Sequence, residues 1–303
     1  MNKYLIAENL KTKRTMLRKI LIFMPILCTI LSFTFDFLGF GYFTADSVFT
    51  SINHWSLLWM PALIALTTSM FHKLEQNSTG YKTIFSFPID LKKSWISKII
   101  LLSSFTLISS IFLCVILTIL NMIFTRTQIN SVPFYYCLIA AIIGWLTSLW
   151  QIPLCLWLSK KINLFVLLLG TCAANMELGA TCAPSSLWWL SPWAFPLRLQ
   201  CPILHHHPNG LPLEPGSSLL NPSVISVGIL IGIFLFLILI TFTTYSFKKS
   251  EVHYVNIPDN IIFNTLSFID NNQLIINYYY MNNKDKIESM FFDLSDLIAK
   301  EVK

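Results

Sequence analysis

The sequence predicts an all-α integral membrane protein with six transmembrane helices, both termini in the cytoplasm and a small α+β tail. Of its 303 residues, 54% are hydrophobic and 12% are charged, and ordinary soluble domains carry about 25% charged residues. The apolar residues fall into long runs, and each run is close to the ~20 residues that a helix needs to cross a bilayer. The runs begin at Ile20, Ser56, Ile99, Phe134, Ile162 and Val224, and the last run ends at Phe247.

The lysines and arginines predict which side of the membrane each connection faces. Those near the membrane are concentrated in segments 1–19, 72–98, 160–161 and 248–249. The segments on the opposite side hold only Arg126 and Arg198. Cytoplasmic connections are enriched in lysine and arginine, so both termini are predicted to lie on the cytoplasmic side of a cell membrane that the chain crosses several times. The net charge of +6 is explained by contacts with membrane lipid, and no nucleic-acid partner is predicted.

Residues 1–19 are predicted to form an amphipathic helix at the inner membrane surface. The residues that would face lipid there are Leu5, Ile6, Leu10, Met16 and Leu17, while lysines and arginines contact the headgroups. The six-helix transmembrane domain follows over residues 20–247.

The inner loop 72–98 is predicted to contain a short helix. Asp90 is a candidate N-cap residue. Leu91 and Trp95 stand four residues apart, which places them on one face of this helix.

The outer loop 181–222 is rich in proline and is predicted to form a rigid cap. Trp188, Trp189 and Trp193 would anchor it at the membrane interface, where tryptophan is enriched. Residues 208–210, Pro-Asn-Gly, predict a turn.

The tail, residues 248–303, is predicted to be cytoplasmic and to contain a β-hairpin and one helix. Two β-type stretches flank Asp270-Asn271-Asn272, a plausible hairpin turn. Apolar residues then recur at helical spacing from about Lys284 to Lys300. We expect the tail to pack on a partner, because it is too small to bury a core alone.

Two carboxylates lie within the apolar runs. Asp36 and Glu177 are each placed in the outer third of the membrane by the helical rise, with Asn175 near Glu177. A carboxylate at this depth is a candidate for substrate contact, although an acid at a helix end that reaches the interface, or a neutral hydrogen-bonded acid, is the alternative. Asn175 and Gln151 are also typical of hydrogen bonds between helices.

The three adjacent histidines, His205, His206 and His207, lie in the outer loop. Their spacing fits no standard zinc site, so we interpret them as turn or surface residues and predict no metal. A disulfide between Cys182 and Cys201 is possible on the outside of a cell; the other cysteines lie in apolar runs and are read as small hydrophobic residues.

A nucleotide site is missing from the sequence. None of its ten glycines stands in a G-x-x-x-x-G-K-[ST] run, so we expect no cofactor on this chain, and any ATP-driven work requires ATP and magnesium on another subunit.

Two stretches resemble a known family. "AENLKTKRTMLRK" near the N-terminus and "SPWAFPLRLQCPILHHHPNGLPLEPGSSLLNPSV" in the outer loop are similar to the permease subunits of lantibiotic-protection (immunity) ABC transporters of the ABC-2 type. The resemblance covers residues 1 to about 250. His205, His206 and the tail depart from the family pattern.

The resemblance implies a non-enzymatic permease subunit in a bacterial cell membrane that expels a cationic lantibiotic-type peptide and so protects the cell. Its implied partners are a cytosolic ATP-binding subunit and a second similar permease or another copy. It also implies an ATPase-coupling helix at Asp90, Leu91, Lys92 and Trp95. For such a peptide, the substrate-contact candidates are Glu177 with the nearby Asn175, and Asp36, for its charged groups, and Trp188, Trp189 and Trp193 for its apolar face. Two alternatives remain: a membrane protein that protects by sequestering or sensing the peptide, and a membrane enzyme that uses the histidines.

Overall fold

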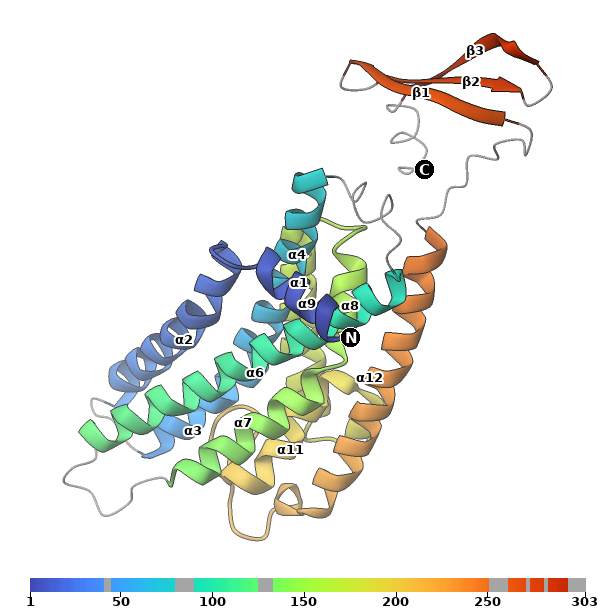
Figure 1. The fold of residues 1–303 in the computed structure, drawn as a ribbon. Helices are drawn as coiled ribbons and strands as arrows, with labels where there is room; N and C mark the ends of the chain where they lie inside the picture. Colours follow the sequence, from blue (N-terminus) through green and yellow to red (C-terminus); the bar gives the residue numbers. More distant parts are fainter. Residues whose placement is uncertain are drawn as a thin grey trace. The chain divides into compact units, whose positions relative to one another are not determined.

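The computed structural model describes residues 1–40, 45–79, 90–124 and 133–250 and three strands within 261–293 (Figure 1). The chain forms two compact units, Met1–Ser250 and Glu251–Lys303. The α-helices of the first unit are α1 (Asn2–Lys11), α2 (Met16–Phe40), α3 (Ala45–His54), α4 (Met60–Thr79), α6 (Leu91–Phe124), α7 (Phe134–Ser148), α8 (Gln151–Leu158), α9 (Leu164–Ala174), α10 (Ala180–Cys182), α11 (Phe195–Leu204) and α12 (Ser223–Ser250). Two π-helical turns, η1 (Trp55–Trp59) and η2 (Asn175–Gly179), and three 3-10 turns, η3 (Trp188–Leu190), η4 (Pro192–Ala194) and η5 (Ser218–Leu220), complete the described elements of this unit.

Five helical segments among the described residues are long and apolar enough to cross a membrane. They are Met16–Gly39, Ser47–Asn77, Leu91–Ile123, Leu164–Cys182 and Ser223–Phe247. The pair α7 and α8 makes a sixth span if it is counted as one, with a bend of 46° between its halves. Counted in this way, the candidate spans coincide with the six predicted runs.

The bend between α7 and α8 follows from Pro153. Proline has no N–H to donate to the carbonyl four residues earlier, here that of Leu149, and its ring crowds that carbonyl. The helix therefore breaks at Leu149 and Trp150, between Ser148 and Gln151.

The predicted single helix over residues 1–19 is wrong. Helix α1 ends at Lys11, Arg14 has a left-handed backbone with φ 64°, and α2 begins at Met16. The Arg18 guanidinium donates to the backbone carbonyl of Asn9 at 3.0 Å and to its side chain at 2.6 Å. Basic side chains that bind the last carbonyls stabilise a helix end, so this contact stabilises the C-terminal end of α1 next to the break.

A helix does begin after Asp90, but the prediction that it is short and separate is wrong, because it is the beginning of the long helix α6. Asp90 is its N-cap, as predicted: the carboxylate accepts from the backbone N–H groups of Lys92 at 3.1 Å and Lys93 at 3.2 Å. Residues 80–89 of the inner loop lie outside the described part of the chain.

The segment predicted as an outer cap contributes a buried helix. Helix α11 packs on α7 and α12, and Gln200 on it donates to the hydroxyl of Ser56 at 2.7 Å and the carbonyl of Ala140 at 3.1 Å. Gly144 on α7 permits this approach, because a Cβ there would stand 2.6 Å from the Gln200 amide nitrogen. The expected turn at 208–210 is present, with the Gly210 N–H donating to the His207 carbonyl at 2.8 Å.

The second unit contains an antiparallel sheet in the order β1 (Ile261–Asp270), β2 (Gln273–Tyr280) and β3 (Asn283–Asp293). Strands β1 and β2 agree with the predicted pair, and Asp270 pairs with Gln273. The predicted helix is wrong over Asn283–Asp293, and residues 294–300 lie outside the described range. A short isolated helix is marginal, whereas a third strand pairs the otherwise open edge of β2.

Candidate functional site

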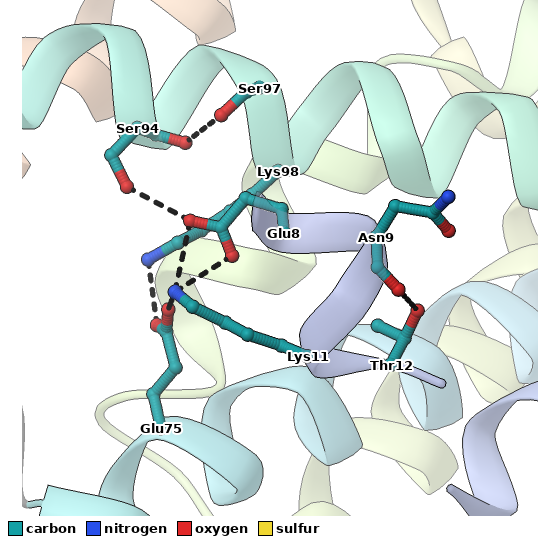
Figure 2. Close-up of polar contacts among 8 residues, drawn as sticks. All are labelled: Glu8, Asn9, Lys11, Thr12, Glu75, Ser94, Ser97 and Lys98. Atoms are coloured by element: carbon teal, nitrogen blue, oxygen red, sulfur yellow. Dashed lines mark hydrogen bonds and ion pairs between the residues drawn. The ribbon is translucent and has the colours of Figure 1, made fainter. Parts of the chain in front are cut away.

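Two acids and two lysines meet at the α1 end of the first unit, which is the region where α1 packs on α6 and Lys11 reaches α4 (Figure 2). We call Glu8, Lys11, Glu75 and Lys98 the charged cluster. The Lys11 ammonium lies 3.0 Å from a carboxylate oxygen of Glu8 and 3.0 Å from one of Glu75. The Lys98 ammonium lies 2.6 Å from the other oxygen of Glu75. The cluster therefore joins three helices through ion pairs.

Most of the charged cluster is removed from solvent. The side chains of Glu8, Glu75 and Lys98 are 4%, 5% and 1% exposed, whereas that of Lys11 is 39% exposed. The hydroxyl of Ser94 on α6 also donates to Glu8 at 3.1 Å. Desolvating a charge is costly unless it is paired and hydrogen-bonded, and here two carboxylates and two ammonium groups balance.

Lys11 is the one member of the charged cluster at the solvent boundary. Burial acts to lower the pKa of its ammonium, but the charges of Glu75 and Glu8 and their hydrogen bonds outweigh burial and raise that pKa. Lys11 is therefore positively charged throughout the physiological range.

The charged cluster continues into an aromatic contact with α12. Trp95 stacks on Phe247 with ring centroids 4.5 Å apart, and its indole N–H donates to the hydroxyl of Thr243 at 3.1 Å. The ammonium of Lys160 lies 3.7 Å from the Phe247 ring centroid and that of Lys98 lies 5.3 Å from it. Cations over aromatic faces are attracted by the ring quadrupole, so α6, α12 and the turn after α8 are joined here.

The four coupling candidates fall into two groups. Asp90 and Lys92 are exposed and Leu91 is half-buried, so these three lie at the surface. Trp95 is only 1% exposed and packs inside the chain. The backbone N–H of Asp90 also donates to the Tyr4 hydroxyl at 3.1 Å, so α1 touches the first turn of α6.

The polar substrate-contact candidates are not gathered into one site. Glu177 is exposed in η2. Asn175 is buried and accepts from the Gln151 amide at 3.3 Å, which is the expected helix–helix hydrogen bond. Asp36 lies in α2, and its side chain is outside the described part of the structure.

The three tryptophans also occupy different surroundings. Trp188 is buried with its ring edge-on to Phe195, at a centroid distance of 5.9 Å, while Trp189 is 48% exposed. Trp193 makes an edge contact with Trp150 at 5.2 Å. Only Trp189 therefore presents a large free surface.

The histidines occupy three different positions. His205 is exposed with φ 57° and ends α11, and His207 accepts from the N–H of Asn209 within the turn. His206 is buried, with its Nδ1 2.7 Å from the Leu204 carbonyl and its ring 5.0 Å from that of Phe49. The expectation of turn or surface positions is wrong for His206, which pairs with Pro212 in an isolated β-bridge and packs its ring against Phe49.

The outer loop also contains possible metal ligands and the two cysteines for which a disulfide was considered. Among the described residues no three His, Cys, Asp or Glu side chains are grouped so that they could hold a metal ion. Cys182 and Cys201 are both free thiols.

Sequence reasoning missed the charged cluster. Lys11 and Lys98 were read as lysines of the inner membrane surface, and Glu8 and Glu75 were not considered. A signal was present, because Glu8 precedes Lys11 by three residues and such pairs are neighbours on a helix. The partner of Lys98 could be found only from the packing of α4 on α6.

The apolar spans and the ion-paired helix ends define a multi-pass protein of the cell membrane. Residues 4–173, more than half of the chain, match the family model described as ABC-2 family transporter protein. The chain belongs to this family and is a membrane component of a transporter. Comparisons with curated proteins and with solved structures gave no match.

Proposed function

We propose that the chain is the permease subunit of an ABC transporter that expels a cationic lantibiotic-type peptide from the cell membrane and thereby protects the cell. The observation that carries the permease role is the family match over residues 4–173. The lack of a P-loop motif in the sequence supports a separate cytosolic subunit that binds ATP and magnesium. A second similar permease or another copy of this chain completes the proposed transporter.

The charged cluster supports a route for coupling ATP hydrolysis to the spanning helices. In this proposal the α1 end faces the cytoplasm, in accord with its lysines and arginines, and the ATP-binding subunit contacts Asp90, Leu91 and Lys92. Displacement of this first turn pulls on α4 through Lys98 and on α12 through Trp95, because both residues lie within two turns of it on α6. A rigid helix carries the displacement across the membrane.

The proposal that the cargo is a cationic peptide rests on the outer loop, residues 181–222. Its resemblance to lantibiotic-protection permeases supports a cationic, membrane-active peptide. The exposed carboxylate of Glu177 offers opposite charge and the exposed ring of Trp189 offers apolar contact. Electrostatic attraction is stronger at the membrane interface than in water because the effective dielectric constant is lower.

Co-purification from membranes tests this function. The chain should bring an ATP-binding subunit with it, and Leu91→Glu combined with Lys92→Glu should release that subunit. Lys13→Glu is the matched control, because Lys13 is exposed in the turn between α1 and α2. Trp95 is unsuitable for this test, since its substitution would disturb the contact with α12. A chain that purifies alone and still protects cells from a cationic peptide would establish sequestration instead.

A further inference from the structure

A cavity of about 490 Å³ lies in the outer loop, within residues 207–217. Its wall includes Leu211, Pro212, Leu213 and Pro215, and Glu214 stands among them. The volume lies within the roughly 300–1,000 Å³ of sites that bind small ligands. The cavity is therefore large enough to hold a side chain of a ligand.

The loop around this cavity is held in a fixed shape by its own contacts. The His207 N–H donates to the Leu211 carbonyl at 2.7 Å, and the Leu213 N–H donates to the His205 carbonyl at 2.8 Å. The buried ring of His206 packs against α3, which fastens the loop to the helices. A site whose shape is fixed in advance loses less conformational entropy when a ligand binds.

The lining of the cavity offers acceptors more readily than donors. Most of its backbone N–H groups are missing or already used. Pro212 and Pro215 have no N–H. The N–H groups that donate within the loop are those of His207, Asn209, Leu211, Leu213 and Ser217. An ionised carboxylate such as that of Glu214 only accepts, so the site favours a ligand that donates.

Glu214 also decides the charge of this surface. Apart from its histidines, the charged side chains of the outer loop are Arg198 and Glu214. Arg198 is 5% exposed and donates to the backbone carbonyls of Ser218 and Leu219, whereas Glu214 is exposed. The charge that this loop presents to a ligand is therefore negative.

We propose that the cavity binds a primary ammonium group, which donates to the Glu214 carboxylate while its carbon chain contacts the leucines and prolines. A lysine side chain fits this description, because it joins an apolar stem to an ammonium with three donors and no acceptor. The inference deepens the proposed function and rests on it only for the source of the ammonium, a cationic peptide.

Binding of a capped lysine tests the site. The purified full chain is placed in phosphatidylcholine nanodiscs without nucleotide, and saturation-transfer NMR measures the affinity. The probes are lysine capped at both ends as amides and the same compound with its side-chain amine acetylated, which removes the charge. We expect the charged probe to bind roughly two- to fivefold more tightly, the effect of one solvent-exposed ion pair.

Two substitutions in the loop locate the site. Glu214→Gln removes the negative charge and should abolish the preference for the charged probe. His205→Asn is the control, because His205 is exposed, lies outside the cavity lining and has φ 57°, a backbone conformation that asparagine tolerates. This variant should keep the preference. Equal binding of the two probes by the wild type, or a preference that survives Glu214→Gln, would overturn the proposal.

A lipid headgroup with a primary ammonium has the same chemistry as lysine. Replacing part of the phosphatidylcholine with phosphatidylethanolamine should leave the affinity for the charged probe unchanged if the ammonium comes from a peptide. Weaker binding would overturn the peptide as the source while retaining the ammonium site. Binding requires neither ATP nor transport. A chain that prefers the charged probe but does not protect cells would therefore contradict the proposed function alone, and a chain that protects cells without this preference would contradict the cavity alone.

Discussion

The α1 end of the first unit and the region around α11, which we call the α11 end, are each stabilised by a different kind of interaction. At the α1 end, Glu75 pairs with Lys98 and Lys11 across three helices. At the α11 end, Gln200 bonds to uncharged acceptors, and the buried Arg198 donates to the carbonyl of Leu219 at 2.8 Å. Ion pairs can exchange partners or be displaced by another charge, whereas a packed interior resists any change in shape. If the proposed coupling route is correct, the α1 end is the part that moves and the α11 end holds its shape.

The largest expected effect comes from Lys98→Met. The methionine retains much of the side-chain volume but removes the ammonium closest to the Glu75 carboxylate, which is 5% exposed, while Lys11 still pairs with it. Removing one partner of a buried pair costs about 3–5 kcal/mol, and we expect the lower part of that range because Lys11 remains. Thermal unfolding in nanodiscs measures the loss.

The double variant Glu75→Gln with Lys98→Met is the control for this prediction. It removes both charges, so it should be more stable than Lys98→Met alone. A double variant that loses the sum of the two single effects would show that the pair is not coupled.

Gly144→Ala should produce the next largest effect, at the α11 end. A Cβ there meets the Gln200 amide nitrogen at 2.6 Å and the Ser56 hydroxyl at 2.9 Å. The Gln200 amide must turn away, which breaks its hydrogen bonds to Ser56 and Ala140. A buried polar group left unpaired costs about 1–3 kcal/mol, and the free energy of unfolding measures the loss. Gly232→Ala is the matched control, because its nearest atom would be 3.7 Å away; an equal loss in both variants would contradict close packing of α11 on α7.

Asp90→Ala should cost about 1 kcal/mol, the usual worth of an N-cap. Asp90→Asn should retain most of the stability, since an amide oxygen also caps a helix. The backbone N–H of Lys93 donates a hydrogen bond to the Asp90 carboxylate, and this bond is the main reason that the pKa of Asp90 lies below 3.8. The ammonium of Lys93 lowers the pKa further. The charge-dependent part of this stability is therefore present above pH 3.8 and is lost as the pH falls through the lowered pKa.

Lys11→Gln should have the smallest effect, below about 1 kcal/mol. The Lys11 side chain is 39% exposed, so solvent screens its charge, and the glutamine amide can still donate to the buried carboxylates of Glu8 and Glu75. The pKa of Lys11 is raised above 10.5, so its contribution is complete below pH 10.5 and is lost as the pH rises through the raised pKa. The difference in unfolding midpoint between the wild type and Lys11→Gln should shrink in that range. A difference independent of pH would mean that Lys11 acts through packing.

The membrane spans could be predicted from the sequence because a helix in lipid must be long and apolar, and both features can be counted along the chain. The Asp90 N-cap could also be predicted, because it depends only on residues two and three positions further along the chain. The break at Arg14 was not predictable, since it depends on Arg18 reaching back to Asn9. Trp95 was taken for a contact surface because its position on a helix face does not reveal that Phe247, distant in the sequence, covers it. Contacts between distant segments decide such cases.

Hydrogen exchange in the complex with the ATP-binding subunit tests the central claim most directly. Backbone amides of α1 and of the first turns of α6 should exchange at different rates with and without ATP. Amides of α11 should exchange at the same rate in both states. A change in α11 with none in α1 would contradict the assignment of the charged cluster as the moving end.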